Sequence, residues 1–477
     1  MSPTGPVPEL HVDLLVIGGG PAGMKAAIQG AKAGKRVLLV DREAHMGGEC
    51  VHRGTIPSKT LRESALFLSG LRRRTEGVFD VRVPPGVEVA SLMRRLKAVL
   101  AQHERYLGHQ IDRNEIARWR GRARFLSSEV VRVRLPTGTE RDVRAERIVI
   151  ATGSRPRSPE NVQVDHEHVL DSDSILSLIY LPRSMTVLGA GVVACEFATI
   201  FAALGVEVTM IDHRDRPLAF LDPELTDFFV RSFEAAGGSF LAGRKTVSAR
   251  FDGVSSVVTE LDGGETLRTE KCLCALGRVA SVEGLELEKA SLALNERAQL
   301  PVDEHGRTAV PHIYAAGDVI GPPALAATAM EQGRHVVRHA FDLPVDAREG
   351  LVPMGIYTIP ELASVGASEK EVREREGGAI VGRSPFAELA RGHINGTTEG
   401  FLKLVCDPQG RKILGAQVAG EGATELVHVA QIAIYAGLEV DAFLENVFNF
   451  PTLHEAYRVA ALDVLGKRAA LARQQAA

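Results

Sequence analysis

The sequence predicts an α/β protein in which two parallel-sheet units are followed by a third, C-terminal region. Two observations predict this fold class: two apolar runs each lead into a glycine-rich turn and a helix, and a further apolar run follows each helix. A chain of 477 residues, 45% of them hydrophobic, can bury several cores, and its length fits about three domains. One compact domain is therefore not expected.

The first unit begins with the apolar run 14–17, which is suited to a buried parallel strand. Gly18, Gly20 and Gly23 follow at the spacing of a dinucleotide-binding turn. The first glycine allows a tight turn, the second lets backbone approach a pyrophosphate, and the third lets the helix pack on the strand. Asp41 ends the next apolar run and is expected to accept a hydrogen bond from a ribose hydroxyl.

A second turn repeats this pattern after the apolar run 185–188. Gly189, Gly191 and Ala194 occupy the three turn positions, and the next predicted strand is followed by Asp212. One such turn is weak evidence, but two complete units of strand, turn, helix, strand and acid predict two Rossmann-like dinucleotide-binding domains. We expect one dinucleotide as a prosthetic group and the other as an exchanged substrate.

The segment 47–59, Gly-Gly-Glu-Cys-Val-His-Arg-Gly-Thr-Ile-Pro-Ser-Lys, resembles the redox-active segment of the flavoprotein pyridine nucleotide-disulfide oxidoreductases. In that family two cysteines five positions apart form a disulfide beside the flavin. Cys50 holds the first position, but Thr55 stands at the second. The resemblance therefore implies an FAD enzyme that takes hydride from a nicotinamide nucleotide and cannot pass electrons to a dithiol.

The resemblance covers nearly the whole chain and implies the order of its domains. The motifs at 150–156 and 313–318 resemble the family's crossings out of and back into the FAD domain. Because the second turn lies between them, the NAD(P)-binding domain is expected as an insertion in the FAD-binding domain. The expected domains are 1–157 (FAD), 158–279 (NAD(P)), 280–349 (FAD) and 350–477 (an α+β dimerisation domain).

The resemblance also implies which residues bind the nucleotides. Besides the glycines of the first turn, the residues expected at FAD are Asp41, Gly48, Cys50, Thr55, Gly153 and Asp318, the last on the ribityl chain. Besides the second turn, those expected at NAD or NADP are Asp212, His213, Arg214 and Gly277. Asp212 suits the 2′-hydroxyl of NAD. Its basic neighbours His213, Arg214 and Arg216 suit the 2′-phosphate of NADP, so we expect use of both nucleotides.

Lys59 and Glu196 are the expected catalytic pair. In this family a lysine after a Pro-Ser pair lies near flavin N5 and pairs with a glutamate on a helix of the NAD(P) domain. A buried lysine and glutamate are costly unless paired, and a positive charge near the ring favours anionic reduced flavin. The alternative interpretation is that Lys59 caps a helix and Glu196 lies on the surface.

The C-terminal region departs a second time from the dithiol-transferring members of the family. In those members a histidine precedes a Pro-Thr pair and acts as acid–base partner of the disulfide, whereas this chain has Phe450. Glu455 stands where the family has a glutamate that orients that histidine, and His454 is expected to be a polar dimer-interface residue. The substitutions at Thr55 and Phe450 both indicate that dithiol chemistry has been removed.

Within the family, this combination most resembles the soluble transhydrogenase subgroup. The resemblance implies reversible hydride transfer from NADPH to NAD⁺ through the flavin, in a ping-pong sequence at one nicotinamide site. It also implies a homodimer or higher homo-oligomer. A flavin-dependent NAD(P)H:quinone or dye reductase remains open as an alternative. A dihydrolipoyl dehydrogenase and a non-catalytic, redox-sensing flavoprotein are less favoured.

Charge, hydropathy and cysteine content argue against other classes. The net charge is only −4, and acidic and basic residues are spread along the whole chain, so no nucleic-acid partner is indicated. The first apolar run is too short for a signal peptide or membrane span, which predicts a cytoplasmic protein without membrane contact. Five irregularly spaced cysteines do not form a disulfide framework. Cys272 and Cys274 lack a second ligand pair, so no metal is expected.

Overall fold

The computed structural model describes residues 9–75, 94–344 and 351–476, and the chain divides into two compact units. The first unit comprises 1–60, 90–157 and 277–348, and the second comprises 61–89, 158–276 and 349–477. The chain thus leaves the first unit after Arg157 and re-enters it at Gly277. The predicted domain limits at 1, 349, 350 and 477 lie outside the described residues.

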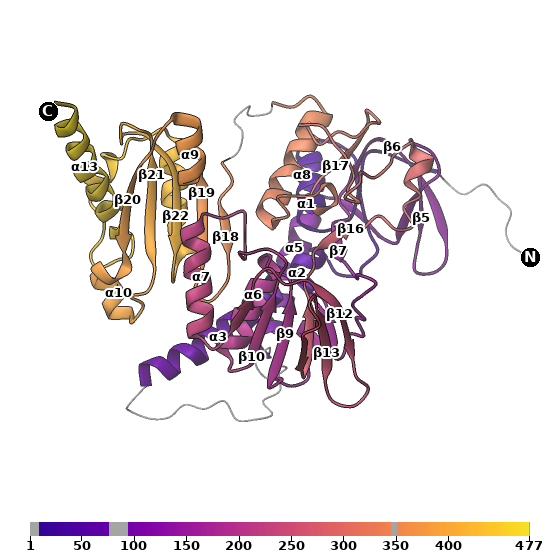
Figure 1. Cartoon of the computed structure of the whole chain (residues 1–477). Helices are drawn as coiled ribbons and strands as arrows, with labels where there is room; N and C mark the ends of the chain where they lie inside the picture. The colour runs from indigo at the N-terminus through magenta and orange to yellow at the C-terminus, as the bar shows by residue number, and fades with distance from the viewer. Residues whose placement is uncertain (1–8, 76–93, 345–350, 477) are drawn as a thin grey trace, which may run out of the picture. The chain divides into compact units, whose positions relative to one another are not determined.

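A largely parallel sheet forms the centre of the first unit, with the strand order β3-β2-β1-β6-β5-β4 and with β17 also paired to β6 (Figure 1). Its strands are β1 (Glu9–Ile17), β2 (Val37–Asp41), β3 (Ala117–Arg120), β4 (Arg122–Phe125), β5 (Val130–Arg134), β6 (Glu140–Ile150) and β17 (Ile313–Ala315). The predicted run 14–17 lies in β1, which is paired with a parallel strand on each edge. Its side chains are buried because Leu14 and Val16 pack in one core and Leu15 and Ile17 in another, on the two faces of the sheet. A separate antiparallel ribbon joins β7 (Ser154–Pro156) to β16 (Arg278–Ala280).

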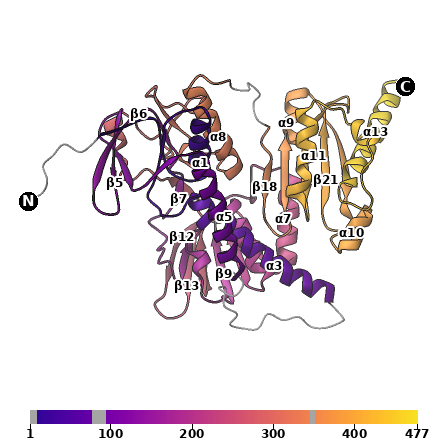
Figure 2. The same cartoon turned by 180° about the vertical axis from the view of Figure 1, so that it is seen from behind.

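Helices of the first unit pack on this sheet and on one another. They are α1 (Pro21–Lys32), α2 (Gly48–His52), α5 (Arg94–Asp112) and α8 (Ala326–Ala340), with the short 3₁₀ helices η2 (Leu287–Ala290) and η3 (Asp318–Ile320). The long helix α3 (Thr55–Thr75) starts in the first unit and continues into the second. Helices α1 and α8 lie side by side in both views (Figure 2). A Cβ on Gly333 of α8 would come within 2.1 Å of the carbonyl oxygen of Ala22, so the two backbones nearly touch.

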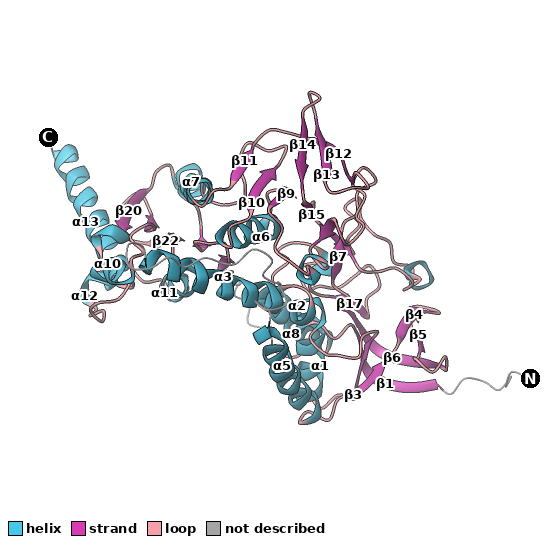
Figure 3. Ribbon diagram, turned by 90° about the horizontal axis from the view of Figure 1, so that it is seen from below, coloured by secondary structure: helices cyan, strands magenta, loops and turns pink. Residues whose placement is uncertain are grey.

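The second unit contains a parallel five-stranded sheet in the order β11-β10-β9-β15-β8 and a small antiparallel sheet, β12-β13-β14. Its strands are β8 (Val169–Asp171), β9 (Ser184–Leu188), β10 (Glu207–Ile211), β11 (Ser239–Leu241), β12 (Thr246–Phe251), β13 (Val257–Leu261), β14 (Thr266–Thr269) and β15 (Lys271–Cys274). The 3₁₀ helix η1 (Ile175–Ser177) follows β8. Figure 3 shows α6 (Val192–Ala203) beside β9 and β10, and α7 (Pro223–Ala235) follows β10 in the chain.

The C-terminal part of the second unit is an antiparallel sheet with helices, in the order β18-β19-β22-β21-β20. Its strands are β18 (Met354–Ile356), β19 (Leu362–Gly366), β20 (Ile380–Pro385), β21 (Phe401–Cys406) and β22 (Ile413–Ala419). Its helices are α9 (Glu369–Glu376), η4 (Phe386–Glu388), α10 (Ala390–Asn395), α11 (Ala423–Tyr435), α12 (Ala442–Glu445) and α13 (Glu455–Ala476). Helices α11 and α13 pack on the sheet, and Tyr457 joins them by donating its hydroxyl proton to the Leu426 carbonyl at 2.6 Å. The predicted fold class is confirmed.

Among the described helices, none combines the length and apolar character that a membrane crossing needs.

Candidate active site

The first glycine turn joins β1 to α1 and leaves no room for a side chain at Gly18 or Gly23. Gly18 has a φ of +106°, and a Cβ there would lie 2.2 Å from the carbonyl oxygen of Ala151. A Cβ on Gly23 would lie 1.8 Å from the carbonyl oxygen of Gly18. Both contacts are with backbone, which cannot rotate aside as a side chain can. Glycine is therefore required at both positions.

Asp41, the last residue of β2, is bonded to the same turn. Its Oδ2 accepts a hydrogen bond from the N–H of Gly19 at 2.5 Å, and its Oδ1 accepts one from the N–H of Glu43 at 2.8 Å. Burial raises the pKa of the Asp41 carboxyl, and the two N–H donors oppose that rise. Asp41 therefore holds the turn in place, and its contact with a ribose hydroxyl stays a prediction.

The N-terminus of α1 and Gly48 form a narrow cradle. The nearest atom to a Cβ added on Gly20 is Cα of Gly48 at 4.0 Å, whereas a Cβ on Gly48 would approach Cα of Gly20 to 2.9 Å. No side chain caps α1, so its first N–H groups are available to an anion. Oγ1 of Thr152, just before the positive-φ residue Gly153, is buried without a hydrogen-bond partner among the described residues. These features fit the pyrophosphate and hydroxyl groups of FAD.

Cys50 and Thr55 lie close together where α2 ends and α3 begins. Burial raises the pKa of the Cys50 thiol, while a hydrogen bond with Thr55 and the positive charge of Lys59 oppose that rise. The thiol is thus mostly protonated at neutral pH and is a weak nucleophile. All five cysteines, each of them within the described residues, are free.

Asp318 opens η3 directly after Gly317, which has a φ of +81°. Its Oδ2 accepts a hydrogen bond from Oγ of Ser154 at 2.7 Å, and that Oγ accepts one from Nε of Arg278 at 2.8 Å. These three residues therefore hold the two crossing segments together. Ser154 and Arg278 were not predicted as site residues, because motif spacing does not reveal side-chain direction. Gly277, with a φ of +103°, makes the turn into β16.

The second glycine turn repeats the design of the first. The N–H of Ala190 donates to Oδ2 of Asp212 at 2.8 Å, as the N–H of Gly19 does to Asp41. Gly189 has a φ of +103°, and a Cβ there would lie 2.7 Å from a backbone carbonyl oxygen. Among the described residues, no atom lies within 4 Å of a Cβ on Gly191, which leaves the N-terminus of α6 open to a ligand.

Ala194, the third predicted position of the second turn, is fully buried on α6. Beyond the turn, Nδ1 of His213 lies 3.3 Å from Oδ1 of Asp212, and the backbone N–H of Arg214 donates to the same oxygen at 2.8 Å. The exposed guanidinium of Arg214 has no hydrogen-bond or ion-pair partner in the described part of the chain. It is therefore available to a phosphate.

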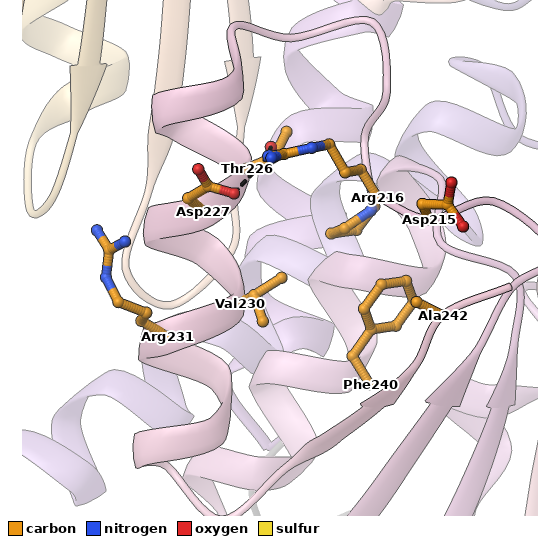
Figure 4. A pocket seen from close by; sticks show the side chains of 9 residues that line it. Asp215, Arg216, Thr226, Asp227, Val230, Arg231, Phe240 and Ala242 are labelled. Carbon is orange, nitrogen blue, oxygen red and sulfur yellow. Dashed lines mark hydrogen bonds and ion pairs between the residues drawn. The ribbon is translucent and has the colours of Figure 1, made fainter.

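Arg216, which was grouped with Arg214 from the sequence, is arranged differently. Its Nη1 donates to Oγ1 of Thr226 at 3.1 Å and pairs with Asp227, both on α7 (Figure 4). The sequence interpretation missed this pairing, because the acid lies eleven residues further along the chain. Arg216 is thus already engaged by a carboxylate.

Glu196 lies in the middle of α6 and is only 5% exposed, so the alternative of a surface residue is wrong. Its Oε1 accepts a hydrogen bond from the N–H of Tyr357 at 3.0 Å. Oγ1 of Thr199, one turn further along, accepts one from the N–H of Ile359 at 3.1 Å. Helix α6 therefore holds the segment after β18 by two side-chain acceptors.

Arg62, on α3, holds the same segment and was not predicted. Its Nε donates to the carbonyl oxygen of Thr358 at 3.1 Å, and its Nη2 lies 2.9 Å from Oε1 of Glu361. Lys59, three residues earlier, belongs to the first unit, whereas Glu196 belongs to the second. Their pairing stays a prediction.

The loop before α13 exposes large apolar side chains. Val447 is 92% exposed and Phe450 is 74% exposed, and His454 is exposed as well. Oε2 of Glu455 is buried and has no hydrogen-bond partner among the described residues.

Elsewhere in the second unit, Cys272 is buried in β15, and burial raises the pKa of its thiol. Within the described ranges, no group of three or more His, Cys, Asp or Glu side chains could hold a metal ion.

Two family models together match most of the chain. The family model described as "Pyridine nucleotide-disulphide oxidoreductase" matches residues 12–333. The model described as the dimerisation domain of that family matches residues 352–461. The first match spans both glycine turns, and the second spans the antiparallel sheet with α11.

Individual proteins are similar over nearly their full length. A soluble pyridine nucleotide transhydrogenase of Mycobacterium bovis is 42% identical over 460 residues, which cover 96% of this chain and 98% of the relative. One of Hahella chejuensis is 38% identical over 471 residues, covering 96% and 99%. The crystal structure of LpdA from Mycobacterium tuberculosis superimposes with a TM-score of 0.87 at 26% identity, covering 94% and 99%. The HOCl-induced flavoprotein disulfide reductase RclA from Escherichia coli has a TM-score of 0.84 at 25% identity, with the same coverage.

Proposed function

The chain belongs to the pyridine nucleotide-disulphide oxidoreductase family, and we propose that it is a transhydrogenase that carries hydride from NADPH to NAD⁺, reversibly, through FAD. The observation that carries the proposal is Thr55 beside Cys50 in a chain whose two dinucleotide turns are complete. A dithiol acceptor requires two cysteines, so the acceptor must itself come to the flavin. The second turn offers a nicotinamide nucleotide as that acceptor. Relatives with this activity in their names, 38–42% identical, support the proposal.

The first unit is proposed to hold FAD through its cradle. When bound, FAD supplies the ring that accepts a hydride and gives it back. The N–H groups at the start of α1, between Gly20 and Gly48, would bind the pyrophosphate. The orphaned hydroxyl of Thr152 would gain a partner. Asp318, held by Ser154, would accept a hydrogen bond from a ribityl hydroxyl.

Lys59 and Glu196 are proposed as the charged pair at the reacting end. The charge of Lys59 acts on the thiol of Cys50, and Glu196 is a buried carboxylate that receives an N–H group. A buried carboxylate is costly without a compensating cation, which Lys59 would provide. Hydride transfer between two rings needs alignment first, so the pair would act by charge and position and would not act as a base.

One nicotinamide site is proposed to serve donor and acceptor in turn, which gives ping-pong kinetics. The site must then accept adenosine with and without a 2′-phosphate. Asp212 suits the 2′-hydroxyl of NAD, although its oxygens also receive backbone N–H groups. Arg214, whose guanidinium has no partner among the described residues, suits the 2′-phosphate of NADP.

The C-terminal region is a dimerisation domain, which indicates a homodimer. We propose that the exposed side chains of Val447 and Phe450 lie in that interface, because large apolar groups on a loop favour burial against a partner. Glu455, whose Oε2 is buried without a partner, would gain a donor there.

Arg214→Ala is expected to raise the KM for NADPH about tenfold while leaving the KM for NADH nearly unchanged, because only NADPH carries the 2′-phosphate. Initial rates with each reductant measure both constants. Arg250→Ala, which removes an exposed arginine of β12 in the same unit, is the matched control and is expected to change neither. An equal rise for both reductants would contradict the assignment of Arg214.

The reaction itself is tested with purified, yellow holoprotein under anaerobic conditions. NADPH-dependent reduction of thio-NAD⁺ is measured beside reduction of menadione. Rapid turnover with thio-NAD⁺ and parallel lines in double-reciprocal plots are expected for a ping-pong transhydrogenase. Turnover on menadione alone would instead make the enzyme a quinone reductase and end the proposal.

A further inference from the structure

A hollow of about 540 Å³ lies between α7, β11 and the loop that follows β10. Figure 4 shows the side chain of Arg216 extending from this loop to α7, where it meets Thr226 and Asp227. Val230 and Phe240 provide apolar lining. The feature that needs an explanation is why an arginine so close to the second glycine turn is directed onto a helix.

The backbone around Arg216 is held on both sides. The N–H of Gly243 donates to the carbonyl oxygen of Arg214 at 3.1 Å, and the N–H of Leu218 donates to that of Ala190 at 2.9 Å. Ala190 belongs to the second glycine turn, so the loop is fastened directly to the predicted nucleotide site. With its backbone fixed at two points, Arg216 can change its contacts chiefly by rotating its long side chain.

The contacts that hold the Arg216 side chain are of a kind that a phosphate can replace. Oγ1 of Thr226 donates its own proton to the carbonyl oxygen of Pro223 at 3.0 Å and therefore only accepts from Arg216. Both members of the Arg216–Asp227 ion pair are 49% exposed, and exposed pairs of this kind contribute little to stability. A phosphate dianion is a stronger partner for a guanidinium than a single solvated carboxylate.

We propose that Asp227 is a specificity-determining residue, which competes with the 2′-phosphate of NADP for Arg216 and so weakens the binding of NADP relative to NAD. This inference rests on the proposed function, because it requires the second turn to bind both nucleotides. NADP and NAD use the same site in turn in the proposed reaction. If NADP bound much more tightly than NAD, it would block the binding of NAD, and competition from Asp227 reduces this difference. Asp227 touches neither the substrate nor the reacting atoms and acts only through Arg216.

The test is a double-mutant cycle on the holoenzyme, with Asp227→Asn, Arg216→Ala and the double variant. The dissociation constants of adenosine 2′,5′-bisphosphate and of 5′-AMP are measured by calorimetry, so no hydride transfer is needed. Asp227→Asn is expected to tighten binding of the bisphosphate about two- to fivefold, the range for releasing an exposed ion pair. Binding of 5′-AMP is expected to stay unchanged. In the Arg216→Ala background, Asp227→Asn is expected to have no effect.

Glu260→Gln is the matched control, because it removes one acidic charge from an exposed pair with Arg250 on β12 and β13. It is expected to leave both constants unchanged. The inference is overturned if Asp227→Asn changes neither constant, tightens both ligands equally, or still tightens the bisphosphate without Arg216. Equal tightening by Glu260→Gln would also overturn it, since net charge would then explain the result. Turnover with thio-NAD⁺ in the absence of these effects would refute the role of Asp227 alone and leave the proposed function standing.

Discussion

Gly23→Ala is expected to yield a protein that retains little FAD and unfolds at a lower temperature than the wild type. The added Cβ would lie 1.8 Å from the carbonyl oxygen of Gly18 and 3.2 Å from Cγ1 of Val16. Neither β1 nor the turn can give way, because β1 is paired on both edges. Helix α1 must therefore move, and overpacking of this kind costs about 1–3 kcal/mol or more. The movement displaces the N–H groups that form the cradle with Gly48.

Two measurements check this expectation: the ratio of flavin to protein absorbance after purification, and the thermal unfolding midpoint. Gly108→Ala, on α5 of the same unit, is the matched control, since no atom of the residues that the structure describes lies within 4 Å of its added Cβ. Alanine there removes a helix-weakening glycine and is expected to stabilise the protein by up to about 1 kcal/mol, with unchanged flavin content. Full flavin content and an unchanged midpoint in Gly23→Ala would refute the argument from backbone contact.

Features that depend on the backbone were predictable from the sequence. Both glycine turns, their strands and their acidic partners follow from apolar runs and from residues with no side chain, which are local properties. Asp41 and Asp212 were correctly placed at strand ends. Their hydrogen bonds to Gly19 and Ala190 were not foreseen, because the family pattern directs attention to the ribose.

Features that depend on side-chain partners distant in sequence were not predictable. Asp318 and Ser154 are separated by 164 positions, and Glu196 and Tyr357 by 161. Such pairs depend on rotamers and on the packing of whole elements, and neither is encoded in a motif. Lys403 is the clearest example, since nothing in the apolar strand around it identifies its acidic partners.

Lys403→Met is expected to lower the free energy of unfolding by about 3 kcal/mol, the lower end of the cost of breaking a buried ion pair. Lys403 is 1% exposed, and its Nζ lies 3.0 Å from Oδ2 of Asp222, 2.7 Å from Oε1 of Glu224 and 2.9 Å from Oε2 of Glu369. Removing the lysine leaves Asp222 buried without its cation. The lower end applies because Glu224 and Glu369 are partly exposed and can be solvated.

The same cluster links α7 to the C-terminal sheet of the second unit, so the loss is expected to reach the nucleotide site. Asp222 is the N-cap of α7 and accepts a hydrogen bond from the N–H of Glu224 at 3.0 Å. Helix α7 also carries the residues that engage Arg216. Because Asp227 is proposed to compete with the 2′-phosphate for Arg216, displacement of α7 in Lys403→Met is expected to tighten binding of adenosine 2′,5′-bisphosphate. Lys412→Met, at an exposed lysine, is expected to change neither stability nor binding.

The pH dependence of the stability that Lys403→Met loses distinguishes the contribution of the lysine charge from that of its packing. Hydrogen bonds from Arg383 and Lys403 lower the pKa of Glu224 from 4.5 to about 2. A carboxyl with a lowered pKa contributes stability that is present above its unfolded pKa and is lost as the pH falls toward its folded pKa. The deficit of Lys403→Met, measured by urea unfolding, is therefore expected to be larger at pH 7 than near pH 4, where Glu224 of the unfolded chain begins to protonate and the stabilisation that Lys403 gives this carboxylate begins to be lost. An equal deficit at both pH values would show that Lys403 stabilises the protein by packing and not by its charge.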